Sequence, residues 1–452
     1  MFCGIICTCL KGKSDTRKGE NMLGRKEQEK MRFEYTSARK MLNAHLHICI
    51  KNFEKVNNSK PVEHYADRLK ENVSVKEKLK LKNLLLTREN IEKLHDIVGA
   101  RLICPFIDDV YDMVELIKKS DLLQIYEIKN YIKEPKKSGY QGIHVLIGIP
   151  VRMGERIKYV KGEIQVRTVA MDAWAAVEHR LKYKPKGNGK LDKDEKEMLI
   201  TCSRAFKGLE QYLIGFLPKE QEIKQEKIKL VDFDSNRLKN LNELNQKALE
   251  QLKTYLNVAI DYYHLKNGQN KIEHFDYRLK PLDSALRKLK EKNCELTMDS
   301  LENNVRDYIG IRLVCPFIDD VYDVVDLIKS SDFLEVYEEK DYIKNPKESG
   351  YQSVHLLVKV PVVDGNDRKF VKAEIQVRTL TMDAWAALED RIKYLGQNNT
   401  LTTKQRDELK TCAEAFKEID EYMNSLNKHT NKKDSIDDGN TKVLKKKILN
   451  KC

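Results

Sequence analysis

Cysteine is sparse in this sequence, with ten residues in 452, and no two have the CxxC spacing of a zinc site. A disulfide framework is therefore excluded, and we expect a reducing, cytoplasmic setting. Long apolar runs are also missing. The longest, residues 1–10, is under half of the roughly 20 residues that span a bilayer, and it lacks the basic start of a secretory signal. We expect no membrane contact and a disordered leader over 1–26, rather than a metal or acylation site at its Cys3, Cys7 and Cys9.

Common phosphate-binding and hydrolytic motifs are absent too. No Walker loop, Rossmann glycine fingerprint, HExxH or GxSxG occurs, which removes the commonest nucleotide-binding and hydrolase classes. Charge is abundant, at 34% of residues, with 83 Lys and Arg against 70 Asp and Glu. The resulting net charge of +13 favours anionic partners such as nucleotides or RNA, and charge alone does not choose between them.

A tandem duplication organises the chain. Residues 96–183 align without a gap on residues 307–394 and are identical at 56 of 88 positions. A repeat of about 200 residues is far longer than a solenoid period, so each copy is expected to fold as a domain. The expected divisions are a leader (1–26), copy one (27–217), a charged linker (218–236), copy two (237–427) and a basic, mobile tail (428–452).

Each copy alternates between the hydrophobic periods of strands and helices. Residues 100–106 are a β-branched run typical of a buried strand, and 107–120 place apolar side chains at the 3.6-residue period of a helix. Further strands are expected at 145–150 and 162–166, and further helices at 172–183 and 193–216. This order predicts two tandem α+β domains, each a mixed β-sheet flanked by helices.

One expected strand has a wholly polar face. In KGEIQVRT, the two-residue period of a strand places Glu163, Gln165 and Arg167 on the same side. Copy two keeps the pattern at Glu374, and a sheet face that merely meets solvent would look similar. Retention of all three polar residues in both copies favours a functional face.

A second acidic residue stands just before the expected buried strand. In HDIVGAR, Asp96 precedes Gly99 and Arg101, and copy two has Asp307 in the same place. Mg²⁺ often takes one or two protein carboxylates and fills its coordination sphere with substrate phosphate and water. Asp96 and a carboxylate on a neighbouring strand are thus a candidate magnesium site, and a turn aspartate that caps the strand is the alternative.

Two basic segments flank these carboxylates. In RLKENVSVKEK, Ser74 and Glu77 have the spacing of a capping box, which predicts a helix start among cations and hence a phosphate site. The segment YIKEPKKSGYQGIH is expected to be an exposed loop between strands, where Tyr140 either stacks on a base or packs the loop down.

In this order and spacing, the motifs RxKxxxSxxxK, DxxGxR, YIxxPKxxGY and ExQxRT followed by MDxWA resemble the synthetase domain of the RelA/SpoT alarmone family. The resemblance is closest to the small, stand-alone synthetases, and it covers about 27–216 and again 237–426. It implies a nucleotidyltransferase-like fold and a GTP/GDP diphosphokinase. Such an enzyme moves the pyrophosphate of ATP to the ribose 3′-hydroxyl of GDP or GTP with Mg²⁺ and makes (p)ppGpp in the stringent response.

The resemblance also implies residue roles. In copy one, the ATP site would comprise Arg68, Lys70, Ser74, Lys78 and Arg101, with the two arginines around adenine. Magnesium would be held by Asp96 and Glu163, and Glu163 would also position or deprotonate the 3′-hydroxyl. GDP or GTP would meet Lys136, Tyr140 and His144. The same roles in copy two fall on Arg278, Lys280, Ser284, Lys288 and Arg312, on Asp307 and Glu374, and on Lys347, Tyr351 and His355.

The copies depart from the family pattern in different places. Copy one has Gly142 where the family loop usually has the serine that copy two keeps as Ser353, and copy two has Asp390 in place of His179. Neither change removes a proposed metal ligand, so two active sites are favoured over one. Two alternatives stay open: a toxin-type acceptor, either an adenine nucleotide or the 3′ end of tRNA, and a non-catalytic nucleotide or RNA binder. The tandem is expected to be a pseudo-symmetric monomer or to form a homo-oligomer.

Overall fold

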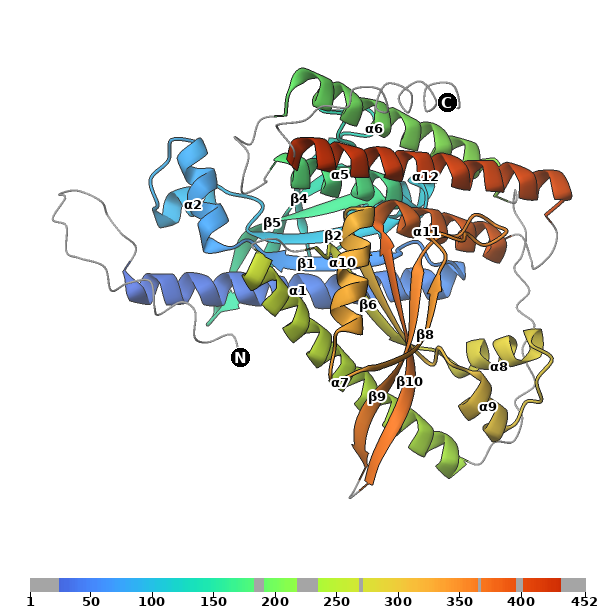
Figure 1. The fold of residues 1–452 in the computed structure, drawn as a ribbon. Helices are drawn as coiled ribbons and strands as arrows, with labels where there is room; N and C mark the ends of the chain where they lie inside the picture. The colour runs from blue at the N-terminus through green and yellow to red at the C-terminus, as the bar shows by residue number, and fades with distance from the viewer. Residues whose placement is uncertain are drawn as a thin grey trace.

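The computed structural model describes residues 24–182, 191–217, 235–267, 271–364, 367–395 and 401–431. Copy one consists of α1 (Arg25–Asn57), β1 (His64–Leu69), α2 (Asn72–Leu81), α3 (Arg88–Glu92), β2 (Val98–Cys104), α4 (Ile107–Lys118), β3 (Gln124–Asn130), β4 (Ile143–Met153), β5 (Arg156–Thr168), α5 (Val169–Lys182) and α6 (Lys193–Ile214). Copy two repeats the order with α7 (Ser235–Asn267), β6 (His274–Leu279), α8 (Leu282–Glu291), α9 (Met298–Asn304), β7 (Ile309–Cys315), α10 (Ile318–Lys329), β8 (Glu335–Asp341), β9 (Val354–Asp364), β10 (Asp367–Thr379), α11 (Leu380–Leu395) and α12 (Thr403–Asn431) (Figure 1).

Each copy is built on a five-stranded mixed sheet. The strand order is β1-β2-β5-β4-β3 in copy one and β6-β7-β10-β9-β8 in copy two. Only the central pair, β2 with β5 or β7 with β10, is parallel, and the other neighbours are antiparallel. The predicted mixed α+β architecture is therefore confirmed.

The strands and helices expected from the sequence are present, with ends shifted by a few residues. The strand expected at 100–106 is β2, and the helix expected at 107–120 is α4. Hydrophobic periodicity did not find β1 or β3. Both are edge strands with mostly exposed or half-buried side chains, so they lack the apolar run that marks a central strand.

One face of each sheet is apolar and covered by two helices. In copy one, α1 contributes Leu42 and Leu46, and α4 contributes Val110 and Met113, to a core with the inward residues of β2, β4 and β5. Helices α7 and α10 cover the sheet of copy two in the same way. The polar face of each sheet therefore remains for the site.

The two copies share one hydrophobic core. Helices α5, α6, α11 and α12 pack side by side, and their buried residues form a single cluster that also includes Phe106 and Phe317 (Figure 1). Phe206 of α6 and Phe416 of α12 meet across it, with ring centroids 5.7 Å apart. The copies are thus joined by a buried interface as well as by the chain.

The expected divisions between the copies stay predictions. Most of the leader and the linker, and the tail beyond residue 431, lie outside the described residues. Helix α1 starts at Arg25 and α12 continues to Asn431, so regular structure extends past the expected limits of both copies. Within the described ranges, no helix has the length and apolar character needed to cross a membrane.

Replacing Phe416 with alanine tests the shared core. Phe416 is 2% exposed and contacts the rings of both Phe206 and Trp385. We expect Phe416→Ala to lower the free energy of unfolding by about 3–5 kcal/mol, measured by urea denaturation. Phe370→Ala is the control, because Phe370 is 54% exposed and should cost much less. Equal losses in the two variants would contradict a core shared by the copies.

Candidate active site

Strand register brings the predicted polar residues onto one face of the sheet. Glu163 of β5 lies opposite Gly99 of β2, which in turn lies opposite Arg68 of β1. The Arg68 side chain runs across Gly99, so that a Cβ on this glycine would be 3.6 Å from Arg68 Cγ. One row further along, Arg101 lies opposite Gln165, and Gln165 opposite His144 of β4.

Copy two has the same rows. Glu374 lies opposite Gly310, and Gly310 lies opposite Arg278. In the next row, Arg312 lies opposite Gln376. In each copy, the glutamate predicted to bind magnesium and the two arginines predicted to bind adenine therefore lie on one face of the sheet.

Two lysines hold the aspartate that precedes the central strand. Lys70 Nζ is 2.6 Å and Lys78 Nζ is 2.7 Å from Asp96 Oδ2. Burial would raise the pKa of Asp96, but hydrogen bonds and charges from both lysines lower it below its ordinary value. Copy two repeats the cluster around Asp307, which Lys280 and Lys288 approach at 2.5 and 2.7 Å. The pKa of Asp307 is lowered to about 2, because the same lysine contacts outweigh its burial.

Helix α2, which carries Lys78, begins earlier than the capping box predicts. The helix starts at Asn72, with Glu71 as its N-cap, so Ser74 and Glu77 are interior residues. The physical reason is the preceding strand: Lys70 N donates to Ile97 O at the end of β1, and the chain turns into the helix directly afterwards. In copy two, Pro281 occupies the N-cap and Ser284 accepts a hydrogen bond from Arg287. The prediction that Ser74 caps the helix is therefore wrong, and its phosphate-binding role is a proposal without support from a cap.

A tyrosine, a histidine and a glutamate form a hydrogen-bonded chain in each copy. His144 Nδ1 is 2.7 Å from Glu163 Oε1, and His144 Nε2 is 2.5 Å from the Tyr140 hydroxyl. Burial raises the pKa of Glu163, but its bonds to His144 and Gln165 outweigh this and lower it overall. Glu163 is thus a fixed carboxylate, and the negative charge of Asp96 acts on it and partly opposes the lowering of its pKa.

Copy two forms the same chain at slightly longer distances. Tyr351 is 2.9 Å from His355, and His355 is 3.0 Å from Glu374. Each of these residues was predicted to belong to the site, but their contacts with one another were not predicted.

The loop tyrosine is more enclosed than a stacking platform requires. Tyr140 is 7% exposed, and the Lys136 ammonium lies 4.6 Å from its ring centroid and 4.4 Å from that of Tyr131. In copy two, Lys347 lies in the same way over Tyr342 and Tyr351, and Tyr351 is half-buried. A base can reach the tyrosine only when this lysine moves from the ring.

The loops of the two copies differ in backbone conformation at one position. Gly142 has a φ of 144°, a region that favours glycine, whereas its counterpart Ser353 is fully buried and donates to Val377 O at 3.2 Å. The glycine of copy one therefore has a different backbone conformation from the serine of copy two, one residue before β4.

Two buried aspartates are functional candidates that the sequence analysis missed. Asp172, at the start of α5, lies 3.0 Å from Arg167 and 3.3 Å from Arg101. It also contacts His274 of the other copy at 2.9 Å. The only signal for Asp172 was its place in the motif MDxWA, which occurs in both copies.

The counterpart in copy two is Asp383, at the start of α11. It lies 2.5 Å from Arg378 and 3.4 Å from Arg312, and His64 of copy one contacts it at 2.6 Å. Each aspartate therefore links the polar sheet face of its own copy to the other copy.

The residues present fit a magnesium ion. Asp96 Oδ1 and Asp307 Oδ1 are buried and have no hydrogen-bond partner among the described residues, so each has an acceptor available to a cation. No group of three or more His, Cys, Asp or Glu residues suited to a metal occurs in the ranges that the structure describes. Two carboxylates per copy instead match an ion that completes its coordination with phosphate and water.

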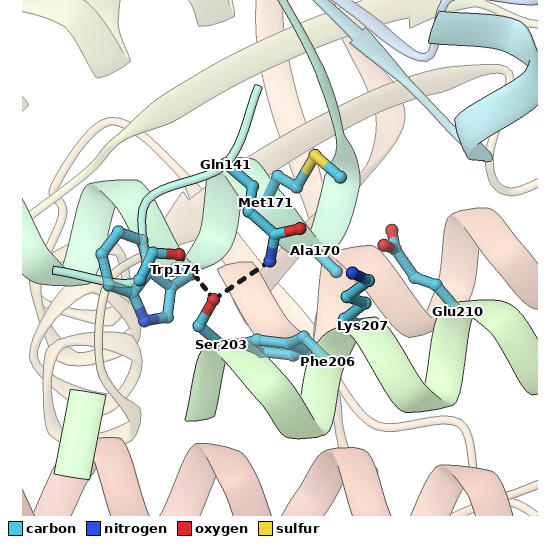
Figure 2. A pocket seen from close by; sticks show the side chains of 9 residues that line it. Gln141, Ala170, Met171, Trp174, Ser203, Phe206, Lys207 and Glu210 are labelled. Atoms are coloured by element: carbon cyan, nitrogen blue, oxygen red, sulfur yellow. Dashed lines mark hydrogen bonds between the residues drawn. The ribbon is translucent and has the colours of Figure 1, made fainter. Parts of the chain in front are cut away.

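A hollow behind the loop shows how the loop is supported. It is lined by Gly139, Gln141, Trp174, Ser203 and Glu210, among others, and its volume of about 230 Å³ includes open solvent. Figure 2 shows Ser203 between its partners: its hydroxyl donates to Gly139 O at 2.6 Å and accepts from Gln141 Nε2 at 3.2 Å. The hollow is smaller than most nucleotide-sized pockets and lies between the loop and helices α5 and α6, so we assign it to loop support.

Comparison with known proteins identifies the family of the chain. The family model described as "Region found in RelA / SpoT proteins" matches residues 67–188 and 277–399. The chain belongs to this family. The chain is 41% identical over 181 residues to the GTP pyrophosphokinase YwaC of Bacillus subtilis, covering 40% of this chain and 86% of that protein. It is 33% identical over 181 residues to GTP pyrophosphokinase YjbM of the same organism, covering 40% and 84%.

Among solved structures, the chain is similar to small alarmone synthetase 1 of Bacillus subtilis bound to its product pppGpp. The identity is 30%, the match covers 44% of this chain and 100% of that chain, and the TM-score is 0.41. Small alarmone synthetase 2 of the same organism matches at 34% identity over 42% of this chain and 96% of that chain, with a TM-score of 0.38.

The buried carboxyl of Glu210, which lines the hollow, gives a pH-dependent test of the packing there. Glu210 is 1% exposed, and burial raises its pKa to about 8, although hydrogen bonds from Thr168 and the Ala170 backbone oppose the shift. The group's contribution to stability is therefore fully present below its ordinary pKa of 4.5 and is lost as the pH rises to about 8. We expect Glu210→Gln to gain stability relative to the unmodified protein across this interval, measured as urea midpoints at several pH values.

Glu115→Gln is the control, because Glu115 is exposed on α4 and should leave the pH dependence unchanged. A Glu210→Gln variant whose stability follows the pH as the unmodified protein does would contradict a buried neutral carboxyl.

Proposed function

We propose that the chain is an alarmone synthetase that transfers the pyrophosphate of ATP to the ribose 3′-hydroxyl of GDP or GTP. The observation that carries this proposal is the pairing, in each copy, of a lysine-bound aspartate with a histidine-bound glutamate, close enough for their charges to interact. The family membership and the names of the two Bacillus subtilis relatives support it.

The reaction needs positioning and charge neutralisation more than covalent help. The 3′-oxygen bonds to the β-phosphorus, the bond from that phosphorus to the α–β bridging oxygen breaks, and AMP leaves with the oxygen. The proton of the hydroxyl passes to solvent as the new bond forms. A bound Mg²⁺ would neutralise charge on the phosphates, and Asp96 and Glu163, or Asp307 and Glu374, would hold it.

The donor meets the cations of the site. Lys70 and Lys78 already converge on one point, 2.6 and 2.7 Å from Asp96 Oδ2, and their remaining N–H groups would bind the donor phosphates. Arg68 lies on β1 and Arg101 on the neighbouring β2, both on the polar face of the sheet, and the two would enclose the adenine. Ser74 is assigned to the phosphates by motif position alone.

The acceptor is held from the loop side. Glu163 accepts from His144, and its lowered pKa makes it a weak base. We therefore give it the role of orienting the 3′-hydroxyl through a hydrogen bond rather than of removing its proton unaided. Lys136 would exchange its contact with Tyr140 for the acceptor's phosphates and thereby open the ring to guanine. In copy two, Lys347 would leave the ring of Tyr351 in the same way, beside His355, which bonds the Tyr351 hydroxyl.

The first test of this proposal is product analysis. Purified protein with ATP, Mg²⁺ and either GDP or GTP is expected to yield ppGpp or pppGpp plus AMP, resolved by anion exchange, and EDTA should abolish the product. Parallel reactions with AMP or tRNA as acceptor test the toxin-type alternative. Product formed only in those reactions would replace the guanine acceptor, and saturable nucleotide binding without turnover would indicate a non-catalytic binder.

The second test apportions activity between the copies. We expect Asp96→Asn and Asp307→Asn each to leave the activity of the other copy, and the double variant to lose at least about 100-fold in turnover, because each aspartate is central to its cation cluster. Asp112→Asn is the control, since Asp112 is exposed on α4 at the opposite face. Full turnover in the double variant would overturn the assignment of both aspartates.

A further inference from the structure

The sites of the two copies are not equally self-contained. The copies face each other through the edge strands β1 and β6, where His64 and His274 stack with ring centroids 5.3 Å apart and an interplanar angle of 8°. Glu63 stands just before β1, and its N–H donates to Ile103 O at 2.7 Å, which anchors its backbone to β2. From this anchored backbone, its side chain extends toward copy two.

Glu63 reaches the site of copy two. Its Oε1 is 3.1 Å from Nη1 of Arg312, which lies on the polar face of β7 opposite Gln376. The same Nη1 is 3.4 Å from Asp383, and both carboxylates are largely buried, with side chains 16% and 4% exposed. Arg312 is therefore held by one carboxylate of its own copy and by one of copy one.

The two charges stabilise each other. Burial would raise the pKa of Glu63, but Lys60, Arg312 and His64 outweigh it and lower this pKa to about 2. Burial likewise opposes the charge of Arg312, yet Asp383 and Glu63 raise its pKa above the ordinary value. Glu63 is thus a permanent anion at neutral pH, and a hydrogen bond between charged groups in a partly desolvated place has a substantial free energy.

The reverse contact is missing. Glu273 is the counterpart of Glu63, but it is exposed, and in the described part of the chain its charge acts on Arg101 without an ion pair. Arg101 is instead held by Asp172 of its own copy at 3.3 Å. The copies also differ two residues after the histidine of each edge strand. Copy two has Asp276 there, 2.7 Å from His64, and copy one has Ala66.

We propose that Glu63 is a positioning residue for the nucleotide site of copy two, which copy one completes by fixing the guanidinium of Arg312. This inference rests on the proposed function in that it takes Arg312 to face the ATP base. Without Glu63, Arg312 is left with Asp383 and with Asp276, its cross-strand neighbour on β6, so the guanidinium loses its ion pair with copy one. The site of copy two thus depends on copy one, and the site of copy one depends less on copy two.

The test isolates each site within the full chain. Glu163→Gln silences copy one, so turnover reports copy two. In that background, Glu63→Gln is expected to raise KM for ATP about fivefold or more, within the usual range of couplings between sites, with little change in kcat. Glu63→Asp keeps the charge and should restore part of the loss.

Two controls separate positioning from general destabilisation. The same Glu63→Gln change in a Glu374→Gln background, which reports copy one, should leave KM unchanged. Glu273→Gln in that background should also change KM by less than about twofold, because Glu273 forms no ion pair with Arg101. Equal KM changes at both sites, an equal effect of Glu273→Gln, or no effect of Glu63→Gln would overturn the proposal.

Calorimetry with the non-hydrolysable analogue AMPCPP makes the test independent of turnover. In the unmodified protein two binding steps are expected, and Glu63→Gln should weaken one of them. A protein that binds AMPCPP in this way but forms no product would contradict the proposed function and leave the role of Glu63 supported. Two unaltered binding steps would contradict the role of Glu63.

Discussion

The buried carboxylates of Asp172 and Asp383 are the interaction on which the rest of the structure depends. Each is at most 4% exposed at the start of a helix, where it binds two arginines of its own sheet and a histidine of the other copy. Burial would disfavour these charges, and the surrounding cations lower both pKa values instead. Removing either carboxylate would take away the shared partner of two arginines and a histidine, at the meeting point of core, interface and site.

This arrangement gives the polar face its stiffness. Arg101 and Arg312 are fixed at their guanidinium ends, and Glu163 and Glu374 are fixed by a histidine and a glutamine each. Catalysis by positioning gains from side chains whose orientation is set before substrate binds. The lysines on Asp96 and Asp307 differ, since in the proposed reaction they would redistribute toward phosphate.

Much of the architecture and part of the site could be predicted from the sequence, for different reasons. Buried strands such as β2 have a continuous apolar run, and helix α4 has a clear period, so both were found. Asp96 and Glu163 were chosen as candidates because a carboxylate beside a strand is chemically conspicuous and recurs in both copies. The edge strands β1 and β3 were not found, because one exposed edge leaves little hydrophobic pattern. Glu63 and His64 were missed because each has partners in the other copy, and no periodicity records which surfaces meet. The repeated EH dipeptide at 63–64 and 273–274 was the only hint for them, as the motif MDxWA was for Asp172.

The alanine at position 66 and the aspartate at position 276 show what covalent linkage of two copies permits. In a homodimer the interface is isologous, so any substitution near the twofold axis appears twice, and a new carboxylate there would arrive as a pair of like charges. A single chain that contains both halves escapes that restriction. It can place one acid beside one imidazole, as Asp276 stands beside His64, and leave the mirror position apolar. Gene fusion thereby frees each half to specialise, and division of labour between once-identical subunits becomes accessible by single mutations.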